Sequence, residues 1–334
     1  MRKLLALATL ALILAPLTGR ADPPAIRLAW SVMPGELAPV IFASHPELAH
    51  NNGKTYAFSP VHITASPQMI QGLAANEIDI AAFAFSSFPL AVQNAGMTDL
   101  RIIADESQDG APGYYTDESK VRNDGGIAKI EDLKGKVLAT NGLGTGVHMS
   151  MTALLKRHGL EEKRDYTVIE VPFPAMTAVL KDKKADMITT TTPFIWAPEL
   201  QAIGKTLFTN KDAIGTSELS FWAMRDSFIK KNRAAVVDLL EDMLRSIRWY
   251  KDPANRKEGI ELIAKFMKRP PAAFEQWIFT KKDFYRDPDL LVDLGALQHN
   301  VDTMKEIGVI KESMDVKKYA DLSMMKEAAA RLKK

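Results

Sequence analysis

Apolar and polar positions alternate with two different periods over the first third of the chain. Short runs of apolar and β-branched residues predict strands at 26–30, 56–64, 78–85 and 100–104. Amphipathic segments between them predict helices that begin near Pro34, Ser66 and Ser86. The 78–85 run is apolar nearly throughout, which is typical of a strand covered on both faces. Strands and helices in alternation indicate a parallel α/β sheet.

The alternation breaks twice. Residues 106–129 are rich in Gly and polar side chains, and residues 215–217 form a second interruption. Between the breaks, the pattern predicts strands at 136–140, 166–171 and 187–190 and helices at 146–158, 176–183 and 194–202. After the second break, it predicts a returning strand at 219–224 and helices at 232–250, 256–267, 271–279, 287–307 and 319–333.

This order predicts two lobes, each a mostly parallel sheet flanked by helices, joined by two crossing segments that act as a hinge. We expect a signal peptide at 1–21, the first part of lobe I at 22–112, lobe II at 113–218 and the rest of lobe I at 219–334.

The first residues resemble a secretory signal peptide. Arg2 and Lys3 precede an apolar run over 4–17, and Gly19 and Ala21 are small residues at a cleavage site. The run is shorter than the roughly 20 residues that span a bilayer, so a retained membrane anchor is the less favoured alternative. We expect removal after Ala21. The chain has no Cys, hence no disulfide and no thiol for a lipid anchor, which predicts a free periplasmic protein.

The net charge of +2, from 43 basic and 41 acidic residues, gives no reason to expect a nucleic-acid partner. The six His are scattered without metal-ligand spacing, and no hydrolase motif is present. We therefore expect no metal site, no cofactor and no enzymatic activity. The loop at 141–146 follows a strand and opens a helix, as in dinucleotide-binding proteins. However, Val147 and Met149 stand where that fingerprint needs Gly.

Ligands of open α/β sheets bind beyond the carboxyl ends of the strands, next to helix N-termini that favour anions. Five loops are expected there: 31–35, 86–87, 141–148, 172–176 and 191–193. From these loops and nearby aromatic residues, the predicted ligand-binding residues are Trp30, Ser31, Met33, Ser86, Ser87, Tyr114, Gly144, Thr145, Gly146, His148, Pro174, Met176, Thr191, Thr192 and Trp196.

Thr145, His148 and Thr191 are predicted to matter most for anion capture. Plain helix capping is the alternative for Ser87 and Thr145, and a surface position is the alternative for His148. For Trp222, at the second crossing, core packing is favoured over a place in an aromatic wall of the ligand site. The five loops contain no Arg or Lys, which favours a monoanion with an apolar or aromatic body over inorganic nitrate.

Three segments resemble a known family. Residues 66–81 are similar to its helix followed by ALxxGExDxA, although Asn76 stands where Gly is usual. Residues 130–136 are similar to its I-x-DLKGK step, and 184–187 to its second GxxDa step. The family comprises the solute-binding proteins of ABC importers for nitrate, taurine and aliphatic sulfonates, with relatives that bind thiamine-precursor pyrimidines and aromatic carboxylates.

The resemblance implies a type II periplasmic binding protein fold with ligand held in the cleft between two lobes. It implies a monomer that captures a small organic anion, a sulfonate or a carboxylate, and delivers it to an ABC permease of the inner membrane. An enzyme on the same fold, similar to those of thiamine-pyrimidine synthesis, is the alternative.

Overall fold

The computed structural model describes residues 22–31, 35–37, 40, 42, 44–63 and 66–333. The predicted signal peptide and Met33 lie outside the described residues. Within the described ranges, every helix is too short or too polar to span a lipid bilayer.

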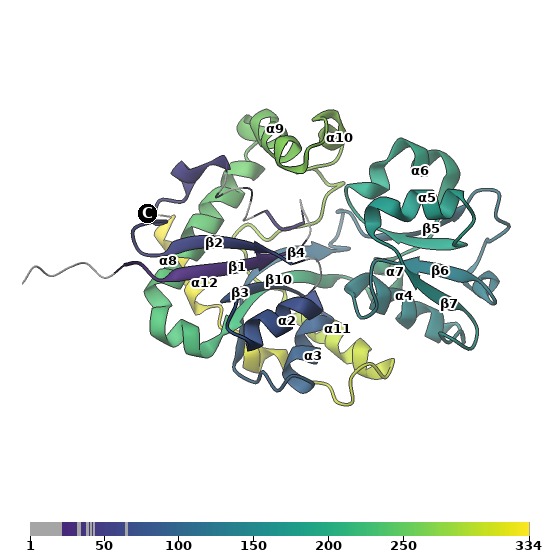
Figure 1. Ribbon diagram of the computed structural model, residues 1–334, viewed down its shortest axis with the longest axis horizontal. Coiled ribbons are helices and arrows are strands. Elements are labelled where there is room, and N and C mark those ends of the chain that lie inside the picture. The colour runs from purple at the N-terminus through teal and green to yellow at the C-terminus, as the bar shows by residue number, and fades with distance from the viewer. Residues whose placement is uncertain are drawn as a thin grey trace, which may run out of the picture.

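The chain forms two five-stranded mixed sheets, each flanked by helices, which lie side by side along the long axis of the molecule (Figure 1). The first sheet has the order β2-β1-β3-β10-β4. Its strands are β1 (Ala25–Trp30), β2 (Ala57–His62), β3 (Ile80–Ala84), β4 (Leu100–Asp109) and β10 (Ser217–Arg225). β1 pairs in parallel with β2 and β3, whereas β10 runs antiparallel between β3 and β4.

The second sheet repeats this plan with the order β7-β6-β8-β5-β9. Its strands are β5 (Glu118–Arg122), β6 (Val137–Thr140), β7 (Thr167–Glu170), β8 (Met187–Thr190) and β9 (Gly204–Thr209). Here β5 is the antiparallel strand, between β8 and β9. Each sheet therefore includes one strand that follows a crossing between the lobes: β10 in the first sheet and β5 in the second. This arrangement confirms the predicted class of two α/β lobes; the residue boundaries predicted for the lobes stay a prediction.

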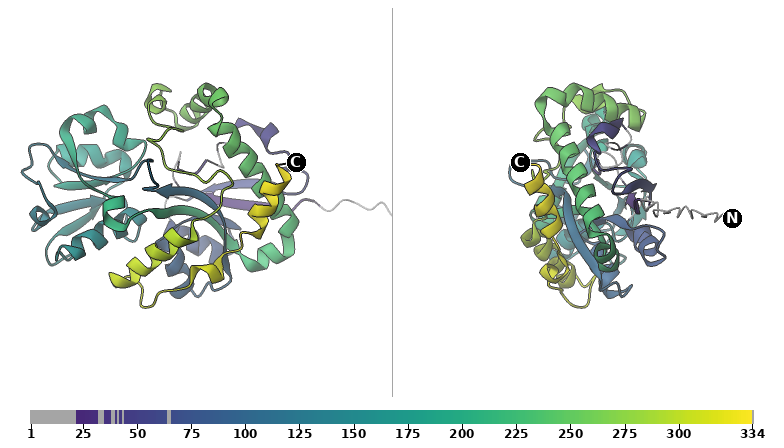
Figure 2. Two further views of the ribbon diagram at one scale, coloured as in Figure 1. Left: turned by 180° about the vertical axis from the view of Figure 1, so that it is seen from behind. Right: turned by 90° about the vertical axis from the view of Figure 1, so that its left-hand side faces the viewer.

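Alternating side chains of the first sheet build two apolar layers, because successive residues of a strand point to opposite faces. Ile80 and Trp222 pack on one face, against α8 (Asp226–Lys251), α9 (Arg256–Met267), α10 (Ala272–Glu275) and α12 (Ser323–Arg331). Phe83 and Phe221 pack on the other, with α2 (Ser66–Ala74), α3 (Ser87–Gln93) and α11 (Leu294–Glu306). Figure 2 shows the helices on both sides of this sheet. The core-packing prediction for Trp222 is confirmed, since its side chain is fully buried.

In the second sheet, α5 (Met176–Lys181) and α6 (Pro198–Ile203) cover one face. The packing of Leu138 and Met187 continues into the apolar layer that also contains residues of α4 (Gly146–Arg157) and α7 (Asn210–Ile214). That layer joins the two lobes, since it includes Phe85 and Phe88 from the first.

Two crossings connect the lobes and run together. The chain passes from β4 to β5 and returns from β9 through α7 to β10. The Asn210 amide donates to the carbonyl of Asp117 at 2.8 Å, and the Thr216 hydroxyl donates to the carbonyl of Gly110 at 3.1 Å. The predicted irregular stretch at 106–129 was therefore partly wrong: β4 extends through Asp109, and β5 lies inside the stretch.

Other differences are local. β9 and α7 were not predicted. The predicted helix at 194–202 divides into a 3-10 turn (Phe194–Trp196) and α6, which has Pro198 at its first position. The predicted helix at 287–307 begins only at Leu294, where Asp293 caps it by accepting from two backbone amides. The predicted helix at 271–279 is confined to α10, and the predicted helix at 319–333 to α12.

Candidate functional site

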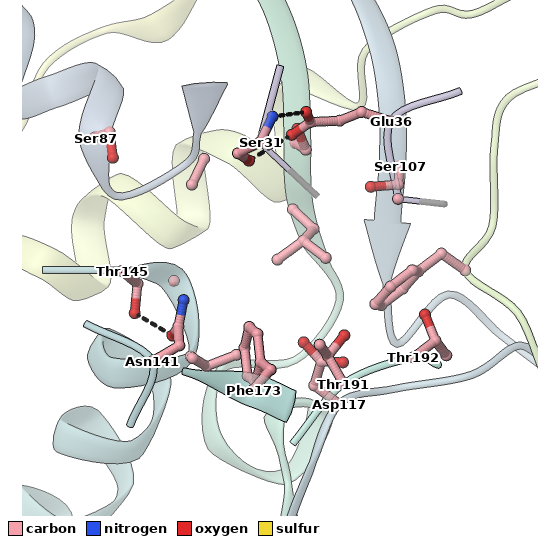
Figure 3. Close-up of a pocket in the computed structure, with 17 residues that line it drawn as sticks. Ser31, Glu36, Ser87, Ser107, Asp117, Asn141, Thr145, Phe173, Thr191 and Thr192 are labelled. Carbon is pink, nitrogen blue, oxygen red and sulfur yellow. Dashed lines mark hydrogen bonds between the residues drawn. The ribbon is translucent and has the colours of Figure 1, made fainter. Parts of the chain in front are cut away.

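A cavity lies between the two lobes, at the carboxyl ends of β1, β3, β4 and β8 (Figure 3). About 830 Å³ of space that no atom fills lies between the lining residues, a volume that includes open solvent. The first lobe and its returning chain contribute Ser31, Gly35, Glu36, Ala84, Ser87, Ser107, Leu219, Ser220 and Phe284; the second lobe contributes Asp117, Asn141, Thr145, Gly146, Val147, Phe173, Thr191 and Thr192.

Two glycines bring the start of α4 to the cavity. Gly144 has φ of 81°, in the left-handed region that other residues rarely adopt, so the loop turns sharply there. A Cβ on Gly146 would lie 3.1 Å from the ring of Phe85 in the first lobe. The absent side chain therefore lets the lobes approach and leaves the first amides of α4 facing the cavity.

The helix-capping alternative for Thr145 and Ser87 is wrong in this structure. Thr145 occupies the N-cap position of α4, but its hydroxyl donates back to Asn141 Oδ1 at 3.0 Å and to the Gly142 carbonyl at 2.8 Å. Ser87 Oγ is buried, lines the cavity and has no hydrogen-bond partner among the described residues. The neighbouring Ser86 hydroxyl donates across the lobes to the Gly144 carbonyl at 2.9 Å.

The ring of His148 is hydrogen-bonded to the loop that precedes α4. The Gly144 amide donates to His148 Nδ1 at 3.1 Å, and Nε2 lies 3.3 Å from Glu162 Oε2. Burial lowers the pKa of His148, and the Glu162 carboxylate opposes this shift. His148 is buried, so the alternative of a surface position is wrong. It is not among the residues that line the cavity, and a contact of its ring with ligand stays a prediction.

Asp117 brings a buried carboxyl group to the second-lobe side of the cavity. Only 3% of the residue is exposed, and its Oδ1 has no hydrogen-bond partner among the described residues. Its backbone amide donates to Asp109 Oδ2 at 3.1 Å, and Asn210 Nδ2 donates to the same oxygen at 3.0 Å. Burial raises the pKa of Asp117 well above its usual range, and the nearby Asp109 raises it further, whereas the hydroxyls of Thr191 and Tyr115 lower it.

A second carboxyl group, Glu36, lies on the first-lobe side (Figure 3). It accepts hydrogen bonds from the amide and the hydroxyl of Ser31. The next residue, Leu37, donates its amide to Glu106 Oε1 at 2.9 Å, which ties this segment to β4. The predicted lack of basic residues in the loops holds for the whole described lining, which includes no Lys, Arg or His.

The structure brings Ser31, Ser87, Thr145, Gly146, Thr191 and Thr192 of the predicted set together around the cavity. Ser86 and Gly144 do not line the cavity themselves. Each precedes a lining residue, and the Ser86 hydroxyl donates to the Gly144 carbonyl. Whether these residues bind ligand stays a prediction.

The remaining predicted residues lie elsewhere. Trp30 stacks on His62 with ring centroids 4.3 Å apart, and Trp196 packs against Tyr115. Tyr114 is 37% exposed and contacts Tyr285. Pro174 is exposed, and Met176 is buried in the core of the second lobe, so that Phe173 is the residue of its loop that reaches the cavity.

Sequence reasoning missed Ser107, Asp117 and Phe284. The predicted strand at 100–104 ends before Ser107, whereas β4 continues through Asp109. The carboxyl end of this strand was therefore placed too early in the chain. Asp117 lies in the stretch taken as irregular, and Phe284 belongs to a C-terminal segment that pairs with β4 through the bridge between Gln108 and Tyr285. Polar residues at the end of a longer β4 were the available signal.

Among the described residues, no cluster of His, Asp and Glu is arranged to hold a metal ion. The lining combines the carboxyl groups of Glu36 and Asp117 and several hydroxyl groups with the apolar side chains of Val147, Phe173, Leu219 and Phe284. The site is suited to holding a small molecule between the lobes.

Comparisons with known proteins agree with this geometry. A model of the NMT1-like family matches residues 19–264. The structure is similar to the periplasmic aliphatic sulphonate binding protein SsuA from Escherichia coli, with 20% identity, a TM-score of 0.69, and coverage of 89% of this chain and 92% of that one. It is similar to the nitrate-binding protein NrtA from Synechocystis, with 17% identity, a TM-score of 0.71, and coverage of 93% and 89%.

A further similar structure is the alkanesulfonate-binding protein SsuA from Xanthomonas axonopodis pv. citri bound to MOPS, with 18% identity, a TM-score of 0.69, and coverage of 91% and 100%. No protein of curated function matches the sequence. The predicted resemblance to binding proteins of ABC importers is confirmed, and at these identities the structural likeness shows the fold.

Proposed function

Because this chain belongs to the NMT1-like family, we propose that it is a solute-binding protein that captures a small organic molecule between its lobes and delivers it to an ABC permease. The observation that carries the proposal is the cavity itself. Its walls come from both lobes, and the lobes are joined by two adjacent crossings. A ligand that contacts both walls stabilises the closed arrangement, which is how hinge proteins couple binding to a change of shape.

The proposal includes export. The signal-peptide pattern at 1–21 supports a mature protein that begins at Asp22 and acts as a monomer in the periplasm, where the similar sulphonate-binding and nitrate-binding proteins reside by name. It includes no catalytic step, in keeping with the binding proteins that the fold resembles.

Native mass spectrometry of protein released from the periplasm without denaturation tests the proposal. We expect a complex whose excess mass is that of one small molecule, and we expect that molecule to be released on denaturation. Ala84→Phe should abolish the complex, because Ala84 lines the cavity on β3 and a phenyl ring there would occupy the solute's space.

The matched control is Ala272→Phe, which adds the same ring at an exposed position of α10, away from the cavity. Melting curves of both variants verify that they fold. An equal amount of bound solute in folded Ala84→Phe and in Ala272→Phe would contradict a site between the lobes.

A further inference from the structure

We infer that the solute presents a positively charged N–H group, such as an ammonium or an amidinium, to the carboxylate of Asp117. This inference rests on the proposed function and names the chemical class of the solute. It replaces the anion that the sequence suggested.

The first support is the unpaired oxygen. Buried polar atoms in folded proteins are almost always hydrogen-bonded, so an exception in a cavity wall calls for a partner. Asp117 Oδ1 is such an exception, on a residue that is 3% exposed. Figure 3 shows the carboxyl group beside Thr191, between the two lobes. The ionised form of Asp117 accepts hydrogen bonds only, so the partner that would stabilise this form is a donor.

The second support is the charge of the lining. Glu36 adds a second carboxyl group on the opposite side of the cavity, and the described lining includes no Lys, Arg or His. Glu36 accepts hydrogen bonds from the amide and the hydroxyl of Ser31. The apolar side chains Val147, Phe173, Leu219 and Phe284 line the same cavity, and apolar surroundings strengthen the attraction between opposite charges.

One feature of the cavity favours the opposite charge. The N-terminus of α4 faces it through Gly146 and Val147 and carries roughly half a positive charge. Asp117 carries a full negative charge only when it is ionised, and in that state its charge exceeds the partial charge of the helix terminus. An anion at the start of α4 is the rival outcome, and pH separates the two.

The titratable groups around Asp117 are Asp109 on β4, Tyr115 on its own segment and Glu118 on β5. α7 adds the Asn210 amide, and the end of β8 adds the Thr191 hydroxyl. Burial and Asp109 raise the pKa of Asp117, so the empty cavity favours the protonated form over the ionised form that a cation needs. A cation must displace that proton, so its affinity rises with pH and binding releases a proton. An anion would accept a hydrogen bond from the protonated group, so its affinity falls with pH.

Three planar probes of nearly equal size test the inference: benzamidine, benzamide and benzoate, which are cationic, neutral and anionic at neutral pH. Each is titrated calorimetrically, up to millimolar concentration, into mature protein from which the native solute has been removed. We expect benzamidine to bind most tightly, with affinity that increases with pH and with proton release measured in two buffers of different ionisation enthalpy.

Asp117→Asn keeps the shape and removes the charge. It should weaken benzamidine about tenfold or more and leave benzamide nearly unchanged. The matched control is Glu306→Gln, at an exposed position of α11 outside the lining, which should change benzamidine binding by less than about twofold. Asp109→Asn should shift the pH dependence of benzamidine binding to lower pH, because one neighbouring negative charge is removed.

No detectable benzamidine binding, tighter binding of benzoate than of benzamidine, or unchanged benzamidine affinity in Asp117→Asn would each overturn the inference. A solute that still co-purifies in the native mass spectrum would then leave the proposed function standing. Loss of the co-purified solute together with any of these benzamidine results would reject the proposed function and the inference.

Discussion

Glu106 links the core of the first lobe to the cavity and predicts an unusual pH dependence of stability. The residue is 2% exposed on β4. Its carboxyl group accepts from the Leu37 amide at 2.9 Å and from the Trp222 indole at 2.6 Å. Burial raises the pKa of Glu106 from 4.5 to about 8, although the positive charge of Arg286 and the two hydrogen bonds oppose the shift.

A raised carboxyl pKa stabilises the folded protein below the unfolded value, and this contribution is lost as pH rises through the folded value. Between about pH 5 and about pH 8, the unfolded chain releases the Glu106 proton and the folded chain retains it. The free energy of unfolding therefore decreases by about 1.4 kcal/mol per pH unit from this group, or about 4 kcal/mol over the interval.

Glu106→Gln removes the titration and keeps the shape. Its amide offers only one acceptor oxygen to two donors, so one donor is left unpaired at a cost of about 1–3 kcal/mol. We expect the variant to be less stable than the parent near pH 5, and the two stabilities to converge or cross near pH 8. Urea unfolding, followed by circular dichroism and Trp fluorescence at several pH values, measures both curves.

The control is Glu306→Gln, an exposed position of α11, whose stability should follow that of the parent at every pH. Curves for Glu106→Gln and the parent that stay parallel across the interval would refute the reasoning, because they would show that Glu106 titrates alike in folded and unfolded chains.

Two further predictions concern the cavity. Ser86→Ala removes the hydroxyl that joins the lobes at the Gly144 carbonyl. The ligand-free protein should therefore open, and its radius of gyration, measured by small-angle scattering, should increase. An unchanged radius would mean that this hydrogen bond does not hold the lobes together. Thr145→Val removes the hydrogen bonds of this hydroxyl within its own loop, so it should lower the free energy of unfolding by about 1 kcal/mol and leave the affinity for benzamidine nearly intact. Thr191→Val removes a hydroxyl beside Asp117, so it should raise the pKa of that carboxyl group and lower the affinity for benzamidine near neutral pH. Equal calorimetric affinities and equal melting temperatures for the two variants would contradict these separate roles.

The periodicity of the sequence predicts the lobes because sheet faces and helix faces are set locally. The apolar run at 78–85 becomes β3, with Ala82 on one face and Phe83 on the other. The strand at 219–224 becomes β10, between β3 and β4. Its antiparallel direction was not visible locally, because it depends on the chain returning from the other lobe.

The site was harder to predict because its side chains gather by tertiary contact. Thr145 and Thr191 were found from the rule that ligands bind beyond strand ends. Asp117 was missed because a polar stretch with several Gly residues has no periodicity, although β5 forms there by pairing with β8 and β9. His148 was placed at the right loop, but its ring orientation depends on Glu162, which is distant from the strand ends.

The fold and the side chains contribute separately to the charge of solute that the cavity favours. The fold places the N-terminus of α4 at the cavity, and any chain with this topology inherits that partial positive charge. The side chains at the same cavity are free to vary, and here they include the carboxyl groups of Glu36 and Asp117, while the described lining includes no Lys, Arg or His. A preference for anions therefore cannot be carried over from the similar sulphonate-binding and nitrate-binding proteins. Because an ionised carboxylate carries about twice the charge of a helix terminus, we expect the protonation of Asp117 to determine which charge of solute this cavity favours.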